Sequence, residues 1–105
     1  MKPTIGRIVH YCLSADDALR VNNARQAAKG AAPAVTTSGA QMQTGNYVQA
    51  GDIFPMMIVR VWINEFGKGK HGVNGQVLLD GNDSLWVTSA EEGELVRQWA
   101  WPERT

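Results

Sequence analysis

The run Ile53–Ile63 constrains the fold of this chain more than any other stretch, because it is typical of a strand that is apolar on both faces. Its β-branched and aromatic residues are the types that pack well on a pleated sheet. Strict alternation places Met57 and Val59 on one face and Ile58 and Arg60 on the other. We therefore expect this strand to be covered on both sides, by the rest of the fold or by another subunit.

Three further runs predict strands that pair with it. The first, Thr4–Cys12, alternates between its two faces. The runs Gln76–Asp80 and Ser84–Ser89 flank the sequence DGND at Asp80–Asp83, which favours a hairpin turn because Gly and Asn tolerate positive φ. Residues 64–75 contain four glycines and few apolar side chains, so they predict a mobile surface loop.

A helix is expected over residues 14–29. Ser14 is a good N-cap, and Asp16 and Asp17 lie in the first turn, where the helix dipole favours negative charge. Gly30 is the expected stop. These elements together predict an α+β domain formed by residues 1–105, in which a small, strongly bent antiparallel sheet or barrel packs against one N-terminal helix. A flexible linker is expected around residues 30–40.

Composition excludes several classes of protein. The chain has 105 residues and one cysteine, so no intramolecular disulfide forms and a reducing cytoplasm is expected. Ten basic and ten acidic residues give zero net charge, which argues against a nucleic-acid coat or a membrane-surface binder. No apolar run approaches the roughly 20 residues of a membrane span, and the N-terminus lacks the apolar region of an export signal.

The residues that could perform catalysis or bind metal are few. His10, Cys12 and His71 are the strong nitrogen and sulfur ligands, and they do not form a zinc motif. His10 and Cys12 are alternate residues of one strand, about 7 Å apart, which is too far for a ready hydrogen bond. The segment Gly67–Lys70 does not lie between a strand and a helix and is no P-loop. We expect a non-enzyme without a metal site or cofactor.

Binding is the favoured class. Of the four tryptophans, Trp62 and Trp86 are explained by core packing, whereas Trp99 and Trp101 are expected to cover a subunit boundary or line a ligand site. An arginine within an apolar strand must pair with a carboxylate or meet an anion. For Arg60, a salt bridge to Asp80 or Asp83 and an anionic ligand both remain open, and Arg7 presents the same choice. The predicted ligand site comprises Arg7, Arg60, Asn82 and Trp86, with Trp99 and Trp101 as neighbours.

Four segments resemble a family of small uncharacterised bacteriophage proteins. They are GRIVHY at Gly6–Tyr11, AGDIFPMMIVRVW at Ala50–Trp62, VNGQVLLDGNDSLWVTS at Val73–Ser89 and the closing WAWPERT at Trp99–Thr105. The resemblance covers most of the chain except Ala24–Gly45. It implies a phage or prophage origin and action in the cytoplasm of an infected host. It brings no catalytic residues to this chain.

Together these observations predict a non-enzymatic phage protein that binds a small anionic, nucleotide-like ligand. Arginines, aromatic faces and amide groups suit such a ligand chemically. An anti-defence role, the sequestration of a host immune signalling nucleotide by a homo-oligomer, is the leading hypothesis by analogy. A virion-associated structural or assembly protein, or a binder of a host protein, is the alternative. Neither a membrane nor a nucleic-acid partner is expected.

Overall fold

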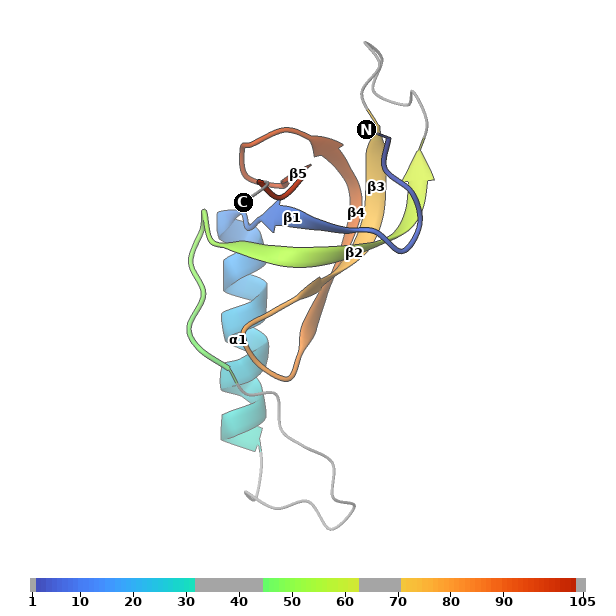
Figure 1. The fold of residues 1–105 in the computed structure, drawn as a ribbon. Coiled ribbons are helices and arrows are strands. Elements are labelled where there is room, and N and C mark those ends of the chain that lie inside the picture. The colour runs from blue at the N-terminus through green and yellow to red at the C-terminus, as the bar shows by residue number, and fades with distance from the viewer. Residues whose placement is uncertain (1, 32–44, 63–70, 104–105) are drawn as a thin grey trace.

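Five strands close into a barrel in the order β1-β2-β3-β4-β5, and one helix stands beside it (Figure 1). The computed structural model describes residues 2–31, 45–62 and 71–103. The elements are β1 (Ile8–Cys12), α1 (Ala15–Ala31), β2 (Ile53–Trp62), β3 (Gly72–Leu78), β4 (Ser84–Glu92) and β5 (Gln98–Ala100). The helix runs from the end of β1 alongside the turn between β3 and β4.

A small barrel with one helix agrees with the sequence-based expectation, and three details correct it. The short strand β5 was not predicted, and it pairs in parallel with β4, so the barrel is not wholly antiparallel. Residues 72–75, expected in a loop, belong to β3. The helix continues to Ala31, one residue past the expected stop. Of the expected linker, residues 32–40 lie outside the described residues.

The barrel interior is filled by one face of each strand. Val9 and Tyr11 point inward from β1, as the alternation predicts, whereas Ile8 and His10 are exposed. The outer face of β2 is open in the single chain, because Met57 is 42% and Val59 39% exposed. Of the two alternatives for covering both faces of β2, the rest of the fold does not cover this one, and coverage by another subunit stays a prediction. The largest fully buried side chains are Trp99, Tyr11, Leu13, Met56, Ile58, Val9, Val48, Val73 and Val77.

An irregularity in β2 decides where its arginine points. The register with β3 shifts between Ile58 and Arg60, so the strict alternation fails there. Ile58 is buried and Val61 packs against the core, while Arg60 is exposed. The sequence-based placement of Arg60 on the same face as Ile58 is wrong for this reason. Opposite this point β3 carries Gly75, where an added Cβ would lie 2.6 Å from the Met56 side chain.

The N-terminus of α1 is capped as the sequence predicts. The Ser14 hydroxyl accepts a hydrogen bond from the Asp17 amide at 3.0 Å, and the Asp17 carboxylate accepts one from the Ser14 amide at 3.1 Å. The same carboxylate accepts a hydrogen bond from the Tyr11 hydroxyl at 2.6 Å. Burial and the neighbouring carboxylate both raise the pKa of Tyr11 well above its ordinary value. This cluster joins the cap of α1 to the interior of β1.

We expect the protein to lose stability at alkaline pH because of Tyr11. Since its folded-state pKa lies above the unfolded value, the contribution is complete below about pH 10 and is lost as the pH rises through the folded-state pKa. Tyr11→Phe should remove this alkaline loss and cost about 1–3 kcal/mol at pH 7. Urea denaturation across that pH range measures both effects. Tyr47→Phe, at a tyrosine 75% exposed, is the control that should keep the wild-type pH profile.

A buried ion pair fastens the second half of α1 to the β3–β4 turn. Arg25 donates to both oxygens of Asp83, at 2.8 Å from Nε and 2.7 Å from Nη2. Each of the two side chains is 6% exposed. Arg25 also donates to the backbone carbonyl of Asn46, and the Asn46 side-chain nitrogen Nδ2 donates to the Asp80 carboxylate at 2.6 Å. The ion pair and these hydrogen bonds therefore connect α1, the segment at Asn46 and the β3–β4 turn, which are distant from one another in the sequence.

Candidate functional site

A largely apolar cleft that includes one lysine and one arginine lies where the segment before β1 meets the end of β2 and the start of β3. We call it the cationic cleft. Its volume is about 470 Å³. The side chains that line it are Lys2, Pro3, Thr4, Ile5, Arg60, Val61 and His71. Of these, only Arg60 was predicted as a site residue.

A turn before β1 brings the N-terminal segment to this cleft. The Arg7 amide donates to the Thr4 carbonyl at 3.2 Å, and Gly6 adopts a φ of 90°, a conformation that glycine tolerates best. The Gly6 amide donates to the Ile58 carbonyl at 2.8 Å, and the Ile58 amide donates to the Arg7 carbonyl at 3.0 Å. These bonds fix the turn against β2, so residues 2–5 are held beside the strand that carries Arg60.

Arg60 lies over a tryptophan, and it forms no ion pair with any carboxylate among the described residues. Its guanidinium carbon is 4.2 Å from the centroid of the Trp62 ring. The Trp62 indole nitrogen donates to the Asn74 side-chain oxygen at 3.0 Å, which fixes the ring. Asp83, one of the two expected partners of Arg60, pairs with Arg25 instead. The salt-bridge interpretation of Arg60 is therefore wrong, and a planar cation held on an aromatic face lines the cleft.

His71 adds a polar group to the cleft at the start of β3. Its Nδ1 atom is buried and has no hydrogen-bond partner among the described residues. Buried polar atoms are nearly always satisfied, so this nitrogen calls for a partner such as a water molecule or a ligand atom. The buried Nε1 atom of Trp101 is also unpaired among the described residues. The His71 carbonyl accepts a hydrogen bond from the Trp99 indole nitrogen at 3.1 Å. A core tryptophan thus positions the backbone of this histidine.

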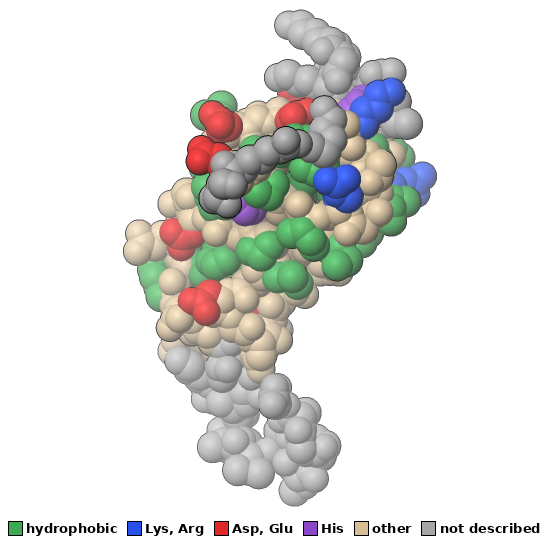
Figure 2. Space-filling model, viewed as in Figure 1, with side chains coloured by type: hydrophobic (Ala, Val, Ile, Leu, Met, Phe, Trp, Pro, Cys, Tyr) green, Lys and Arg blue, Asp and Glu red, His purple; other side chains and the backbone are tan. Residues whose placement is uncertain are grey.

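The charges of the viewed face are separated in space. Figure 2 shows lysine and arginine side chains toward the end of the barrel to which β2 runs, and most of the aspartate and glutamate side chains in view lie on the other side. Like-signed charges gathered around a cleft raise the local concentration of ligands of the opposite sign. The cationic cleft is chemically suited to an anion with an apolar portion, because Ile5 and Val61 stand beside its basic groups.

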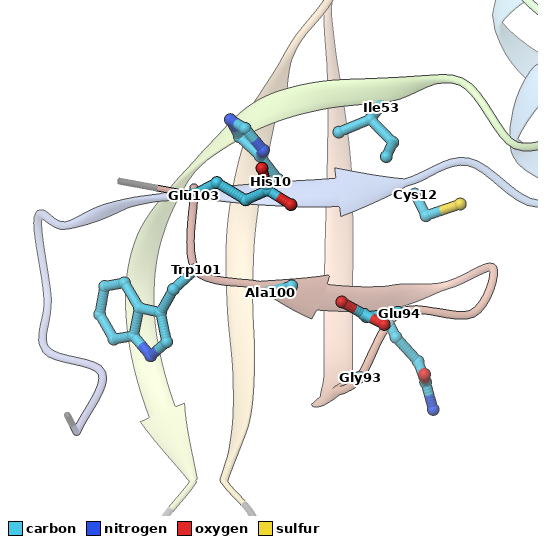
Figure 3. Close-up of a pocket in the computed structure, with 9 residues that line it drawn as sticks. His10, Cys12, Ile53, Gly93, Glu94, Ala100, Trp101 and Glu103 are labelled. Atoms are coloured by element: carbon cyan, nitrogen blue, oxygen red, sulfur yellow. The ribbon is translucent and has the colours of Figure 1, made fainter. Parts of the chain in front are cut away.

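A second cleft follows the outer side of β1 and β5 (Figure 3). We call it the β1–β5 groove. It has a volume of about 540 Å³ and is lined by His10, Cys12, Ile53, Gly93, Glu94, Gln98, Ala100, Trp101 and Glu103. Burial and the nearby Asp52 carboxylate raise the pKa of the Cys12 thiol, which keeps it protonated and poorly nucleophilic at neutral pH. In the described part of the chain, no three His, Cys, Asp or Glu side chains are placed to hold a metal ion.

Comparison with known proteins adds no assignment. No protein-family model, curated protein or solved structure matches this chain. The resemblance to small bacteriophage proteins stays a prediction. Over residues 2–31, 45–62 and 71–103, the structure holds no helix long and apolar enough to cross a membrane.

The predicted tryptophans are dispersed over the fold. Trp99 is fully buried in the barrel and meets Trp101 edge to face, with ring centroids 5.5 Å apart. Trp101 is partly buried and lines the β1–β5 groove. Trp86 lies on the outer face of β4 and is 44% exposed. The three rings therefore do not share one cavity. The core-packing explanation of Trp86 is wrong, and so is the expectation that Trp99 covers a subunit boundary or lines a ligand site, because it is a core residue.

The predicted polar residues are also separated. Arg7 lies over the Trp101 ring, 5.1 Å from its centroid, while Arg60 lines the cationic cleft. Asn82 is exposed in the turn between β3 and β4. The sequence analysis did not assign Lys2 or His71 to the ligand site, and it considered His71 only as a metal ligand. Lys2 reaches the cleft through the turn at Gly6 and His71 was expected in a loop, so local sequence places neither of them there.

Proposed function

We propose that the protein binds a small anionic, nucleotide-like ligand in the cationic cleft and holds it without chemical change. The observation that carries this proposal is that Lys2, Arg60 and His71 line one cleft. Their nitrogens come from three separate segments of the chain. A lysine and an arginine supply the charge-assisted hydrogen bonds that phosphate groups accept.

The dimensions and walls of the cleft support a ligand of nucleotide size. Small-molecule sites commonly have volumes of about 300–1,000 Å³, and this cleft has about 470 Å³. The phosphate is assigned to Lys2 and Arg60, and the base or other apolar portion to Ile5 and Val61. Thr4 contributes a hydroxyl that can donate or accept a hydrogen bond.

A role follows if the resemblance to bacteriophage proteins holds. A non-enzymatic protein that binds nucleotides in an infected cell lowers the free concentration of a host signalling nucleotide. The proposal is therefore sequestration in the host cytoplasm. The binding chemistry at the cationic cleft does not depend on this origin and is tested separately.

Arg60→Gln should weaken binding of an anionic ligand by about ten- to a hundredfold, because a charge-assisted hydrogen bond is worth roughly 1.5–3 kcal/mol. The variant should still fold, since Arg60 is exposed and lies on the outside of β2. Calorimetric titration with a panel of mono-, di- and cyclic nucleotides and pyrophosphate measures the affinity. Arg20→Gln, the same change at an exposed arginine of α1, is the matched control and should bind like the wild type.

The same panel also tests the proposal by thermal melting. A ligand at about 100 times its Kd stabilises the folded state by about 2.7 kcal/mol, which raises the Tm measurably. The absence of any shift across the panel would overturn the proposed function. Equal losses in the Arg60 and Arg20 variants would instead place the ligand elsewhere. Recovery of the chain from purified virus particles, without a ligand shift, would favour the virion-associated role.

A further inference from the structure

Two walls of the cationic cleft lie at the ends of one series of contacts. One wall is the N-terminal segment, residues 2–5, and the other is the start of β3 at His71. The Arg7 amide donates to the Thr4 carbonyl at 3.2 Å, which ties this arginine to the first wall. The Trp99 indole nitrogen donates to the His71 carbonyl at 3.1 Å, which ties this tryptophan to the second wall.

Trp101 joins Arg7 to Trp99. The Arg7 guanidinium carbon lies over the Trp101 ring, 5.1 Å from its centroid, and the same ring meets Trp99 edge to face at 5.5 Å. Figure 3 shows the Trp101 ring beside the chain that leads into β1. A continuous path of contacts therefore runs between the two walls, through Thr4, Arg7, Trp101, Trp99 and His71.

The N-terminal wall has few other attachments. Of residues 2–5, only Pro3 is buried. Among the described residues, the hydrogen bond that holds this segment is the one donated by Arg7. Backbone bonds fix the turn at Gly6 to β2, and β2 in turn pairs with β3 next to His71. The contact of Arg7 with Trp101 is a second attachment, on the side of β5.

We propose that Arg7 and Trp101 are positioning residues of the cationic cleft, which hold Lys2 and His71 at the separation that the anionic ligand requires. This inference deepens the proposed function and rests on it. Arg7 does not line the cleft, so it acts through Trp101 and not by contact with the ligand. A cation over an indole ring is attracted to the ring face, which restrains both groups.

Calorimetric titration with the tightest-binding nucleotide of the panel tests this role. Arg7→Gln and Trp101→Leu should each weaken binding by about twofold to fivefold or more, the range that one exposed cation–π contact supplies. Trp101→Phe keeps a ring for both contacts and should bind within about twofold of the wild type. Trp86→Leu, at a half-exposed tryptophan on the outer face of β4, is the matched control and should not change the affinity.

A double variant distinguishes positioning from a long-range effect of charge. Arg7→Gln combined with Trp101→Leu should bind no more weakly than Trp101→Leu alone, because the two changes remove the same contact. If Arg7 acted by its charge, Arg7→Gln would weaken binding equally with and without Trp101. Equal losses in the two backgrounds, or wild-type affinity in Arg7→Gln, overturn the positioning role. Circular dichroism melting of each variant checks that the barrel is intact.

A measurement without ligand separates this inference from the proposed function. In NMR spectra of the protein alone, Arg7→Gln should shift the backbone amide signal of His71, whereas Arg20→Gln, at an exposed arginine of α1, should leave it in place. An unmoved His71 signal overturns the path through Trp101 even where nucleotides bind. A shifted signal supports that path, and the absence of binding by any member of the panel then counts against the proposed function alone.

Discussion

Asp83→Ala should destabilise the protein by about 3–5 kcal/mol, because it leaves the Arg25 guanidinium buried without its carboxylate. The loss is large relative to the roughly 5–15 kcal/mol that stabilises a typical domain. Urea denaturation at pH 7 measures it. Asp80→Ala, an exposed carboxylate in the same turn, should cost less than about 1 kcal/mol.

A double variant and the dependence of stability on pH distinguish the contribution of the ion pair from that of side-chain packing. Replacing both partners by apolar residues, Arg25→Met with Asp83→Leu, should recover most of the lost stability, because no unpaired charge then remains. Arg25 holds the pKa of Asp83 below its ordinary value, so the stabilisation is present above about pH 4 and is lost as the pH falls through the folded-state pKa. An Asp83→Ala cost no larger than that of Asp80→Ala would show that the pair is not structural.

Trp99→Ala should cost about 3–5 kcal/mol and is expected to leave the barrel largely unfolded at moderate temperature. The side chain is fully buried, packs edge to face on Trp101, and donates its indole hydrogen to the His71 carbonyl. Trp99→Phe keeps an aromatic ring and should cost less. Equilibrium unfolding followed by circular dichroism ranks the two variants.

Trp101→Ala is the control for position 99. Trp101 is only partly buried and lines the β1–β5 groove, so its removal should cost less than that of Trp99. An equal or larger loss at Trp101 would contradict the placement of Trp99 at the centre of the core. Trp99→Phe should also weaken anion binding at the cationic cleft if the indole hydrogen bond positions His71.

The features of the fold that could be predicted from the sequence are those that depend on residues close together in the chain. The strand that begins at Ile53, the hairpin around Asp80–Asp83 and the Ser14 cap follow from local periodicity, turn-forming residues and capping, and the structure contains each of them. The positive φ expected of Gly81 and Asn82 is not found. The inward faces of Val9 and Tyr11 follow from simple alternation. Local patterns of this kind need no knowledge of distant contacts.

What the sequence could not predict depends on residues far apart in the chain. The Arg25–Asp83 pair spans 58 positions, and both residues have ordinary local explanations as a helix arginine and a turn aspartate. The irregularity before Arg60 leaves no local sign, yet it turns that side chain out of the core. The cationic cleft was missed because Lys2 and His71 are brought together only by the closed barrel.

The closure of the barrel rests on a strand of three residues. β5 pairs with β1 at His10 and Tyr11 on one side and with β4 at Glu91 and Glu92 on the other. While β5 stays in place, the barrel has no exposed edge strand to which another polypeptide can add a strand. Its detachment would uncover the backbone of both neighbours at once. Resistance to amyloid-type growth therefore depends on how rarely β5 detaches from its two neighbours. This detachment is a local opening, which needs less free energy than unfolding the whole domain.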